Sequence, residues 1–161
     1  MTTTAGIGWD SHRLAAGRAL ILGGVTIPHD RGLDGHSDAD VLTHAVVDAL
    51  LGAAALGDIG QHFPDTDERY RDADSMALLR SVVATLGDHG LEVAHVDTTV
   101  VMERPKLSPH KDAMRTNLAR ALSVSHDQVS VKATRGEGMG FVGRQEGIAA
   151  LAVATVEDAV V

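Results

Sequence analysis

The stretch from Gly35 to Asp48 constrains the fold more than any other part of the chain, because regularly spaced polar residues there run into an apolar helical pattern. Ser37 is a good helix N-cap, and Asp40 three residues later completes a capping-box-like pair, so the helix is predicted to start at Asp38. The following apolar residues recur at the spacing of a helix with one face in the core. They are Val41, Leu42, Ala45, Val46, Ala49, Leu50 and Ala53.

A second face of this predicted helix carries Asp40, His44 and Asp48, each four residues apart. For the helix taken alone, a merely solvated charged face is the alternative interpretation. Earlier in the chain, Asp10 and His12 lie two residues apart on a segment predicted to be extended, so their side chains point to the same side. Together with His44 they form a set of three ligands of the kind that leaves a catalytic zinc one open position.

The length and charge limit the function classes. The 161 residues suit one domain over 1–161, since no Ser/Pro-rich linker or internal repeat divides them. The 14 basic and 22 acidic residues give a formal net charge of −8, which argues against a nucleic-acid surface. An anionic substrate would therefore need metal ions or a local basic cluster to compensate.

The composition also favours a cytoplasmic protein that does not associate with membranes. There is no cysteine, hence no disulfide framework and no thiolate ligand or nucleophile. No apolar stretch is long enough to span a bilayer, and the first five residues lack the pattern of a signal peptide.

Strands and helices are predicted to alternate, which gives an α/β (α+β) sandwich in which helices cover one face of a mixed β-sheet. The predicted strands are 4–10, the hairpin 19–22 and 25–27, 91–102 and 129–134. The central helix should end near Gly57. A second helix is capped by Asp72 or Asp74 and ends at Gly87 or Gly90, and a third starts at Ser108 and runs through Leu122.

Three segments, 57–67, 103–109 and 135–147, are predicted as loops because glycine, proline and aspartate interrupt regular structure there. The last apolar segment, 148–156, is alanine-rich. Its propensity favours a helix, whereas its β-branched residues allow a strand.

The order of several motifs resembles that of the 2-C-methyl-D-erythritol 2,4-cyclodiphosphate synthase family of the non-mevalonate isoprenoid route, over essentially the whole chain. The matching motifs are Gly8-x-Asp10-x-His12, Gly35-His36-Ser37-Asp38-x-Asp40-Val41-x-x-His44, Leu56-Gly57-Asp58-Ile59-Gly60, Phe63-Pro64-Asp65-Thr66-Asp67, Pro105-Lys106, Val131-Lys132-Ala133-Thr134 and Gly140-Phe141-x-Gly143-Arg144.

The resemblance, and not the composition, implies the assembly and the reaction. It implies a homotrimer with the sheets around the three-fold axis and with active sites between neighbouring subunits. It also implies conversion of 4-diphosphocytidyl-2-C-methyl-D-erythritol 2-phosphate into the cyclic diphosphate and CMP. The substrate's own 2-phosphate attacks the β-phosphorus, so no protein nucleophile and no strong general base is required.

The resemblance assigns two metal ions. Zn²⁺, or another divalent transition metal, falls on Asp10, His12 and His44, with a substrate phosphate oxygen in the fourth position. Mg²⁺ or Mn²⁺ accompanies the diphosphate and is reached by Glu137. Divalent ions of this kind neutralise charge and orient the attack.

The resemblance also assigns the substrate-binding residues. His36 and Ser37 match a mobile loop over the diphosphate, with His36 as the transition-state stabiliser. The turn Pro105, Lys106 and Leu107 binds cytidine from the adjacent subunit, and Thr134 with Glu137 holds the nucleotide phosphates. The methylerythritol pocket matches Asp58, Ile59, Gly60, Phe63, Pro64, Asp65, Thr66 and Asp67, and the substrate site and trimer cavity are lined by Phe141 and Arg144.

Arg135 is the clearest departure, because the family usually has a threonine there. We predict that its guanidinium takes over phosphate stabilisation, since it offers a permanent charge and parallel donors. The alternative is an arginine that extends into solvent.

Two other functions use the same ligands. A metal-dependent phosphohydrolase would place hydroxide at the open position and release a linear phosphate, and a trimeric metal-binding module would bind metal without turnover. The nucleotide motifs at 105–106 and 134 favour the synthase. Asp38, Asp40 and Asp48 are interpreted as structural, and the remaining histidines as surface or hydrogen-bonded residues: His29, His62, His89, His95, His110 and His126.

Overall fold

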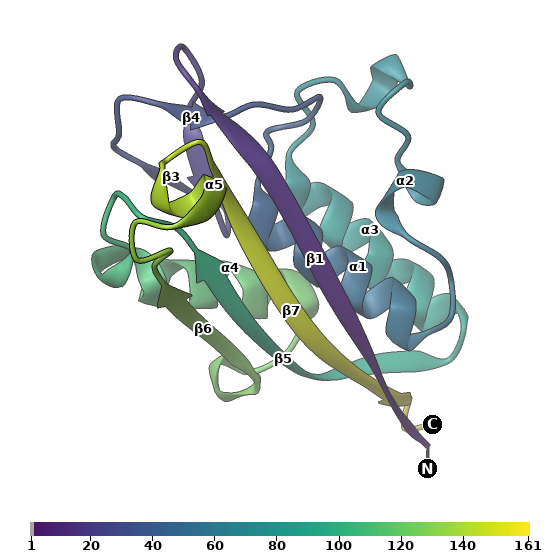
Figure 1. The fold of residues 1–161 in the computed structure, drawn as a ribbon. Helices are drawn as coiled ribbons and strands as arrows, with labels where there is room; N and C mark the ends of the chain where they lie inside the picture. The colour runs from purple at the N-terminus through teal and green to yellow at the C-terminus, as the bar shows by residue number, and fades with distance from the viewer. Residues whose placement is uncertain (1) are drawn as a thin grey trace.

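A mixed five-stranded sheet forms the front layer of the molecule in the computed structural model, which describes residues 2–161 (Figure 1). The strand order is β4-β1-β7-β5-β6, and neighbouring strands are antiparallel except for the parallel pair β5 and β6. Strands β2 and β3 form a separate hairpin. The strands are β1 (Thr3–Ala15), β2 (Leu20–Leu22), β3 (Val25–Ile27), β4 (Gly32–Leu33), β5 (Leu91–Val101), β6 (Val129–Thr134) and β7 (Gly147–Asp158).

Three longer helices, α1, α3 and α4, cover one face of this sheet (Figure 1). The predicted architecture, a mixed sheet with helices on one face, is therefore confirmed. The α-helices are α1 (Val41–Ala53), α2 (Ile59–His62), α3 (Ser75–Asp88), α4 (Lys111–Leu122) and α5 (Gly140–Gly143), and the short 3₁₀ turns are η1 (Glu68–Tyr70), η2 (Ser108–His110) and η3 (His126–Gln128).

The predicted start of the central helix was wrong by three residues. Ala39 has a positive φ of 58°, which interrupts helical backbone, so α1 starts at Val41. Asp40, not Ser37, is its N-cap: Oδ1 accepts the Thr43 N–H at 3.0 Å. The Asp40 carboxylate also accepts the N–H groups of Gly23 at 2.9 Å and Gly24 at 2.8 Å, which ties the β2–β3 hairpin to the helix.

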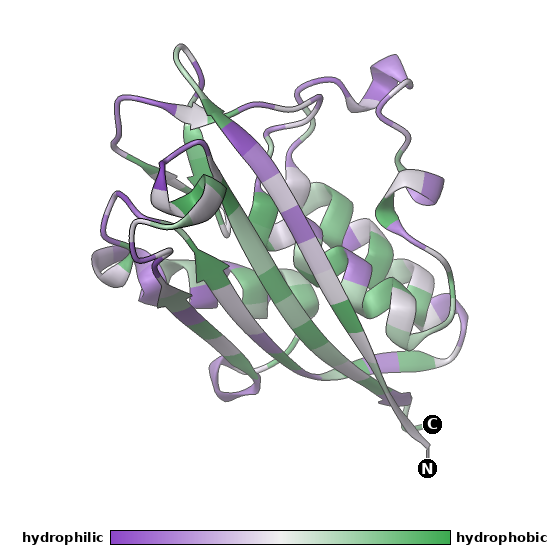
Figure 2. Cartoon of the chain, in the orientation of Figure 1, coloured by the Kyte–Doolittle hydropathy of each residue, from purple (hydrophilic) through white to green (hydrophobic). Residues whose placement is uncertain are grey.

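Pairing between strands that are distant in sequence determines the length or type of several other elements. Strand β1 runs to Ala15, beyond the predicted end at residue 10, because it pairs with β7 up to Arg13 and then with β4 through Leu14 and Ala15. The alanine-rich 148–156 segment is part of β7, not a helix, since β1 and β5 satisfy its backbone groups from both sides. Figure 2 shows β7 as a largely hydrophobic central strand.

Short helical turns occupy segments that the sequence predicted to be irregular. The segment 57–67 contains α2, and 135–147 contains α5. The third helix begins with the 3₁₀ turn η2 at Ser108 and becomes α-helical only at Lys111. The central helix ends at Ala53 instead of near Gly57, whereas the Asp74 cap of α3 is as predicted.

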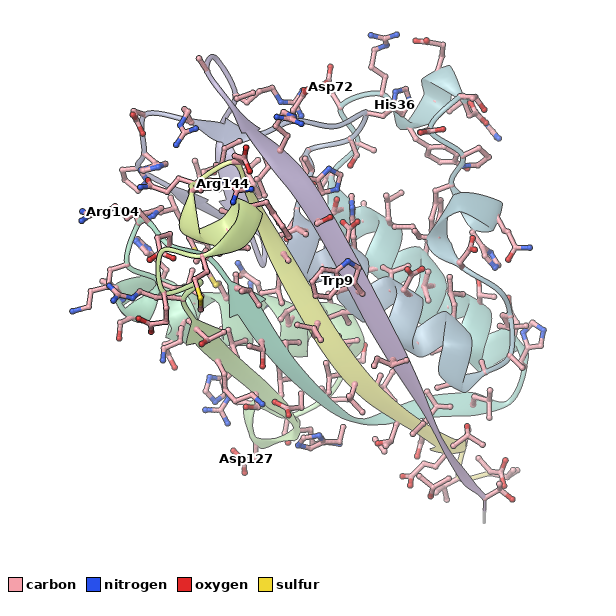
Figure 3. All side chains as sticks on the ribbon, in the orientation of Figure 1. Trp9, His36, Asp72, Arg104, Asp127 and Arg144 are labelled. Carbon is pink, nitrogen blue, oxygen red and sulfur yellow. The ribbon has the colours of Figure 1, made fainter. Side chains whose placement is uncertain are left out.

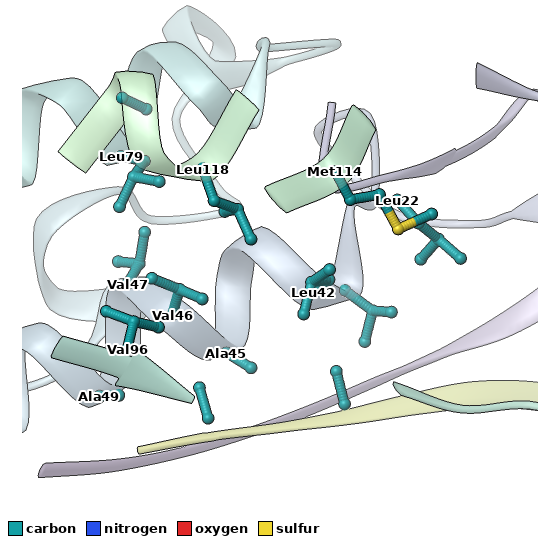
Figure 4. Close-up of a cluster of buried hydrophobic side chains, with 14 of the residues drawn as sticks. Leu22, Leu42, Ala45, Val46, Val47, Ala49, Leu79, Val96, Met114 and Leu118 are labelled. Atoms are coloured by element: carbon teal, nitrogen blue, oxygen red, sulfur yellow. The ribbon is translucent and has the colours of Figure 1, made fainter. Parts of the chain in front are cut away.

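The core lies between the sheet and the helices, and α1 runs through it (Figure 4). Leu42 and Val46 of α1 are fully buried together with Leu79 of α3 and Leu118 of α4. Two glycines of β1 let α1 approach: a Cβ added to Gly8 would lie 1.9 Å from the Ala45 carbonyl oxygen. The close approach brings His44, the residue before Ala45, next to the strand that carries Asp10 and His12.

The opposite face of the sheet exposes apolar side chains. Ile7 is 71% exposed, Trp9 53% and Val153 47%. Figure 3 shows Trp9 on the face of β1 turned away from the helices. Over the part of the chain that the structure describes, no helix has the length and hydropathy needed to cross a membrane.

Candidate metal centre and substrate cavities

Asp10 and His12 of β1 meet His44 of α1 at the sheet–helix boundary, as the residue spacing predicted. Asp10 Oδ2 lies 2.9 Å from His12 Nε2 and 3.2 Å from His44 Nδ1. One potential ligand atom from each residue lies within 4.8 Å of the other two. The two imidazole rings are 5.5 Å apart and meet edge to face.

The charges in this cluster are strongly coupled. Burial raises the pKa of Asp10, but the neighbouring imidazoles of His12 and His44 outweigh that effect and bring it down to about 2. Burial lowers the pKa of His12, while the Asp10 carboxylate and the hydrogen bond to the Asp34 carbonyl raise it, and the net direction of the pKa is upward. In the metal-free protein, Asp10 is therefore an anion that attracts positive charge.

The donors fit a divalent transition metal. One carboxylate and two imidazoles are a familiar set for such ions, with a position left open. His12 Nε2 is buried, and the Asp10 carboxylate 2.9 Å away faces it, so both groups point to the place where an ion would lie. The other nitrogen, His12 Nδ1, lies 2.9 Å from the Asp34 carbonyl oxygen, which orients the ring as in many metal sites.

A cavity of about 400 Å³ opens beside the three ligands. Besides His44, nine residues that the resemblance assigned line it: Asp10, His12, His36, Ser37, Ile59, Gly60, Phe63, Pro64 and Asp65. Tyr70 and Leu78 line it too and were not predicted. Tyr70 packs edge to face on Phe63, with ring centroids 5.3 Å apart, an aromatic contact that only the folded chain reveals.

Three predicted pocket residues lie outside this lining. Asp58 caps α2 by accepting the Gln61 N–H at 3.0 Å. Thr66 is exposed, and Asp67 binds Arg69 through its carboxylate, which lowers the Asp67 pKa. Asp58 and Asp67 thus shape the ends of short turns in this structure.

The loop with His36 and Ser37 is tied to the segment before α3. His36 Nε2 lies 2.9 Å from the Asp67 carbonyl oxygen, and the His36 carbonyl accepts the Asp72 N–H at 2.8 Å (Figure 3). The Ser37 hydroxyl is buried, 3.2 Å from His44 Nε2. The loop thus reaches the metal ligands from the cavity side.

A second cavity of about 430 Å³ is lined by cations. The predicted turn Pro105–Leu107 forms it together with Thr134 and Arg135. Arg104, Lys106 and Lys111 add positive charge, which would suit phosphate groups. This cavity and the metal cavity have no lining residue in common.

Three further predicted site residues line neither of these two cavities: Glu137, Phe141 and Arg144. Glu137 lines neither cavity and sits 3.8 Å from Arg135 across exposed side chains. Phe141 lines a hollow of about 230 Å³ on the other side of His12. Arg144 pairs with Glu146 at 3.0 Å. A single chain therefore does not unite all the predicted site residues.

The acidic residues interpreted as structural have structural contacts. Asp38 accepts the Ser75 N–H at 2.9 Å, and Asp48 accepts the Ile59 N–H at 2.8 Å, where burial raises the Asp48 pKa. Asp40 caps α1 as described above. Two of the unassigned histidines, His62 and His89, are bonded to carbonyl groups, as predicted.

The fold and the site can be compared with known proteins. The model of the YgbB family matches residues 3–157. The chain belongs to the YgbB family.

The sequence similarity to named relatives extends over nearly the whole chain. The chain is 66% identical over 154 residues to the 2-C-methyl-D-erythritol 2,4-cyclodiphosphate synthase of Salinibacter ruber, covering 96% of this chain and 98% of that protein. A solved 2C-methyl-D-erythritol-2,4-cyclodiphosphate synthase in its CDP-bound form has 37% identity and a TM-score of 0.87, with 95% of this chain and 99% of that chain covered.

The bifunctional IspDF of Campylobacter jejuni is also similar, with 41% identity and a TM-score of 0.94. The match covers 98% of this chain and 42% of that longer one. The YgbB fold of this chain thus occurs both alone and within a larger protein.

The metal assignment in this YgbB member can be tested with Zn²⁺ as a probe. Replacing His44 by Ala should weaken Zn²⁺ binding by at least tenfold, because two remaining ligands hold the ion poorly. Binding is measured by competition with a chromophoric chelator after metal removal. His89→Ala is the matched control, because the His89 ring is bonded to the Thr85 carbonyl and lies outside the Asp10, His12 and His44 group, so this variant should bind Zn²⁺ like the wild type. Equal Zn²⁺ affinity in His44→Ala would refute the assignment.

Proposed function

We propose that this protein is a metal-dependent cyclodiphosphate synthase of isoprenoid precursor biosynthesis. It converts 4-diphosphocytidyl-2-C-methyl-D-erythritol 2-phosphate into 2-C-methyl-D-erythritol 2,4-cyclodiphosphate and CMP, which makes it a phosphorus–oxygen lyase. The observation that carries this proposal is the convergence of Asp10, His12 and His44 beside the cavity, in a chain 66% identical to a named synthase.

The reaction balances without a protein nucleophile. An oxygen of the 2-phosphate forms a bond to the β-phosphorus, and the bond from that phosphorus to the bridging oxygen breaks, so CMP leaves with the electron pair. A phosphate monoester with a second pKa of about 6 is largely ionised near neutrality, so it attacks without a strong base. The task left to the protein is to align anionic groups and to stabilise the charge that develops.

Two ions would supply the countercharge. Zn²⁺ or a similar metal fits Asp10, His12 and His44, and Mg²⁺ or Mn²⁺ would accompany the diphosphate near Glu137. When bound, such ions neutralise phosphate oxygens and polarise the phosphorus that is attacked. The strongly acidic Asp10 supports the first assignment, because its pKa of about 2 keeps it an anionic ligand.

The chain's own residues would hold the organic parts of the substrate. Ile59, Gly60 and the segment Phe63–Asp65 line the metal cavity and would enclose the methylerythritol unit. His36 and Ser37 close the same cavity and would contact the diphosphate, with His36 stabilising the transition state. The basic cavity at Pro105–Leu107 and Thr134 would take the cytidine and its phosphates.

A homotrimer with active sites between subunits would complete this site. In one chain the metal cavity and the basic cavity are separate, so a substrate that needs both calls for a second copy. The exposed apolar sheet face with Ile7, Trp9 and Val153 is a suitable interface, since apolar surface of this kind is stabilised by burial. Sheets of three copies would then surround an axis, near which Phe141 and Arg144 would lie. A cytoplasmic location stays a prediction from the sequence.

The products distinguish a synthase from a phosphohydrolase that uses the same ligands. Purified protein with the cytidine substrate, Zn²⁺ and Mg²⁺ should release CMP and a cyclic diphosphate, seen by phosphorus NMR as two coupled phosphorus signals without inorganic phosphate. Release of inorganic phosphate or of a linear phosphate would favour the hydrolase. Metal binding without turnover would favour a binding module.

Mixed oligomers test the shared active site. His44→Ala and Lys106→Ala are each expected to be inactive, because each removes one half of the site. When the two are dissociated and reassembled together, some sites receive intact residues from both chains, so part of the activity should return. Each variant reassembled alone is the control. Failure of rescue in verified mixed trimers would indicate sites contained in one chain.

Arg135 is proposed as a catalytic residue. It lines the basic cavity next to Thr134 and Lys106, and its ion pair with Glu137 is long, at 3.8 Å, with 65% of its side chain exposed. Such a weak surface pair leaves the guanidinium free to bind phosphate oxygens.

Removing that guanidinium should affect turnover more than substrate binding. Arg135→Ala should lower kcat tenfold or more, which is about 1.4 kcal/mol of transition-state stabilisation or more. Arg135→Thr should recover part of the lost kcat, because the threonine supplies a compact hydroxyl donor. Steady-state kinetics check this, with Arg80→Ala, an exposed arginine on α3 away from both of these cavities, as the control. Unchanged kinetics in Arg135→Ala would show that the charge is not used.

A further inference from the structure

A chain of hydrogen bonds, buried at His44 and Ser75 and partly buried at Asp38, leads away from the candidate metal ligand His44. Its Nε2 atom lies 2.8 Å from the Ser75 hydroxyl, and that hydroxyl in turn donates to Asp38 Oδ1. Ser75 is fully buried, and His44 is only 8% exposed. Asp38 and Ser75 come from two different segments, the loop before α1 and the first residue of α3.

The direction of these hydrogen bonds follows from the chemistry of the groups. A carboxylate only accepts, so the single hydroxyl hydrogen of Ser75 must point to Asp38. The Ser75 oxygen can then only accept from His44, which requires the hydrogen of the neutral ring to be on Nε2. The Nδ1 atom keeps its lone pair, and Nδ1 is the atom that lies 3.2 Å from Asp10 Oδ2 in the metal cluster.

Other contacts hold this chain in place. Asp38 Oδ2 accepts the Ser75 N–H at 2.9 Å, Asp38 Oδ1 accepts the Asp40 N–H at 3.1 Å, and the Asp38 N–H donates to the Ala73 carbonyl at 3.1 Å. Ser37 Oγ is also near His44 Nε2, at 3.2 Å, and accepts the Ala39 N–H. The Asp38 carboxylate therefore has little freedom to turn away from Ser75.

We infer that Asp38 and Ser75 are positioning residues that set the tautomer of His44 and aim its Nδ1 lone pair at the metal. This inference rests on the proposed metal centre. It adds to that proposal the residues that orient one of the ligands, His44. The other imidazole ligand, His12, is oriented by a backbone carbonyl of Asp34 instead. Of the two imidazole ligands, His44 is thus the one that side chains orient. Its orientation can therefore be tested by replacing those side chains.

The first test measures Zn²⁺ affinity by chelator competition in the full-length protein. Ser75→Ala should bind Zn²⁺ about 10- to 100-fold more weakly than the wild type, the range typical for loss of such a supporting group. Asp38→Ala should weaken Zn²⁺ binding by a similar factor. The double variant should be little worse than Ser75→Ala, since both residues act through one hydrogen-bonded chain.

Asp74→Ala is the matched control. Asp74 caps α3 through the Met76 N–H at 3.0 Å, directly next to Ser75, but it has no contact with His44. A change that only loosens the start of α3 would weaken Zn²⁺ binding in Asp74→Ala as well. We expect its affinity to equal that of the wild type.

The second test needs no variant and reads the tautomer directly. Long-range proton–nitrogen correlation NMR of metal-free, ¹⁵N-histidine-labelled wild type in mildly alkaline buffer should show His44 with its hydrogen on Nε2. His44→Ala assigns the signal. In Ser75→Ala the signals should shift toward a mixture of both tautomers.

The outcomes separate the two levels of the proposal. If the wild type does not bind Zn²⁺, the proposed metal centre fails. If the wild type binds Zn²⁺ and Ser75→Ala binds it equally well, or if metal-free His44 carries its hydrogen on Nδ1, the positioning role is overturned while the proposed function stands.

Discussion

The close packing of α1 on β1 is the contact on which the rest of this structure depends. Gly6 and Gly8 present no side chain to the helix, and a Cβ at either position would lie within about 2 Å of a helix carbonyl oxygen. Because the two backbones approach so closely, Asp10 and His12 on the strand reach His44 on the helix. The candidate metal centre is therefore a product of the same contact that builds the core.

Buried polar groups hold the start of α1 in that position. The Asp40 carboxylate accepts three backbone N–H groups, from the β2–β3 hairpin and from the helix itself. Burial raises the Asp40 pKa, and the three donors act in the opposite direction. Asp38 forms a similar bridge to α3. Asp38 and Asp40, two residues apart, thus connect three elements around His44, namely the β2–β3 hairpin, α1 and α3. Hydrogen bonds of this kind fix geometry where apolar packing alone would allow sliding.

The separation of the two cavities explains why the site would need more than one chain. The metal cavity lies between β1, α1 and the 59–65 segment, whereas the basic cavity lies at the end of β6 and before η2. The negative total charge is offset locally, since four cationic side chains gather in the basic cavity: Arg104, Lys106, Lys111 and Arg135. A chain with a net charge of −8 can in this way still present a positive surface to an anionic nucleotide.

The sequence by itself determined the elements with strong local signals and the three metal-ligand candidates, because helical and strand spacing place side chains on known faces. Tertiary structure decided the rest. Ala39 in a left-handed conformation moved the helix start to Val41, and pairing on both sides made the alanine-rich 147–158 segment a strand. The contacts of Tyr70 with Phe63, and of Ser75 with His44, join residues that are distant or unpatterned in sequence. Local propensity describes one segment at a time. The hydrogen bonds of a buried backbone, in contrast, depend on partners that lie far along the chain.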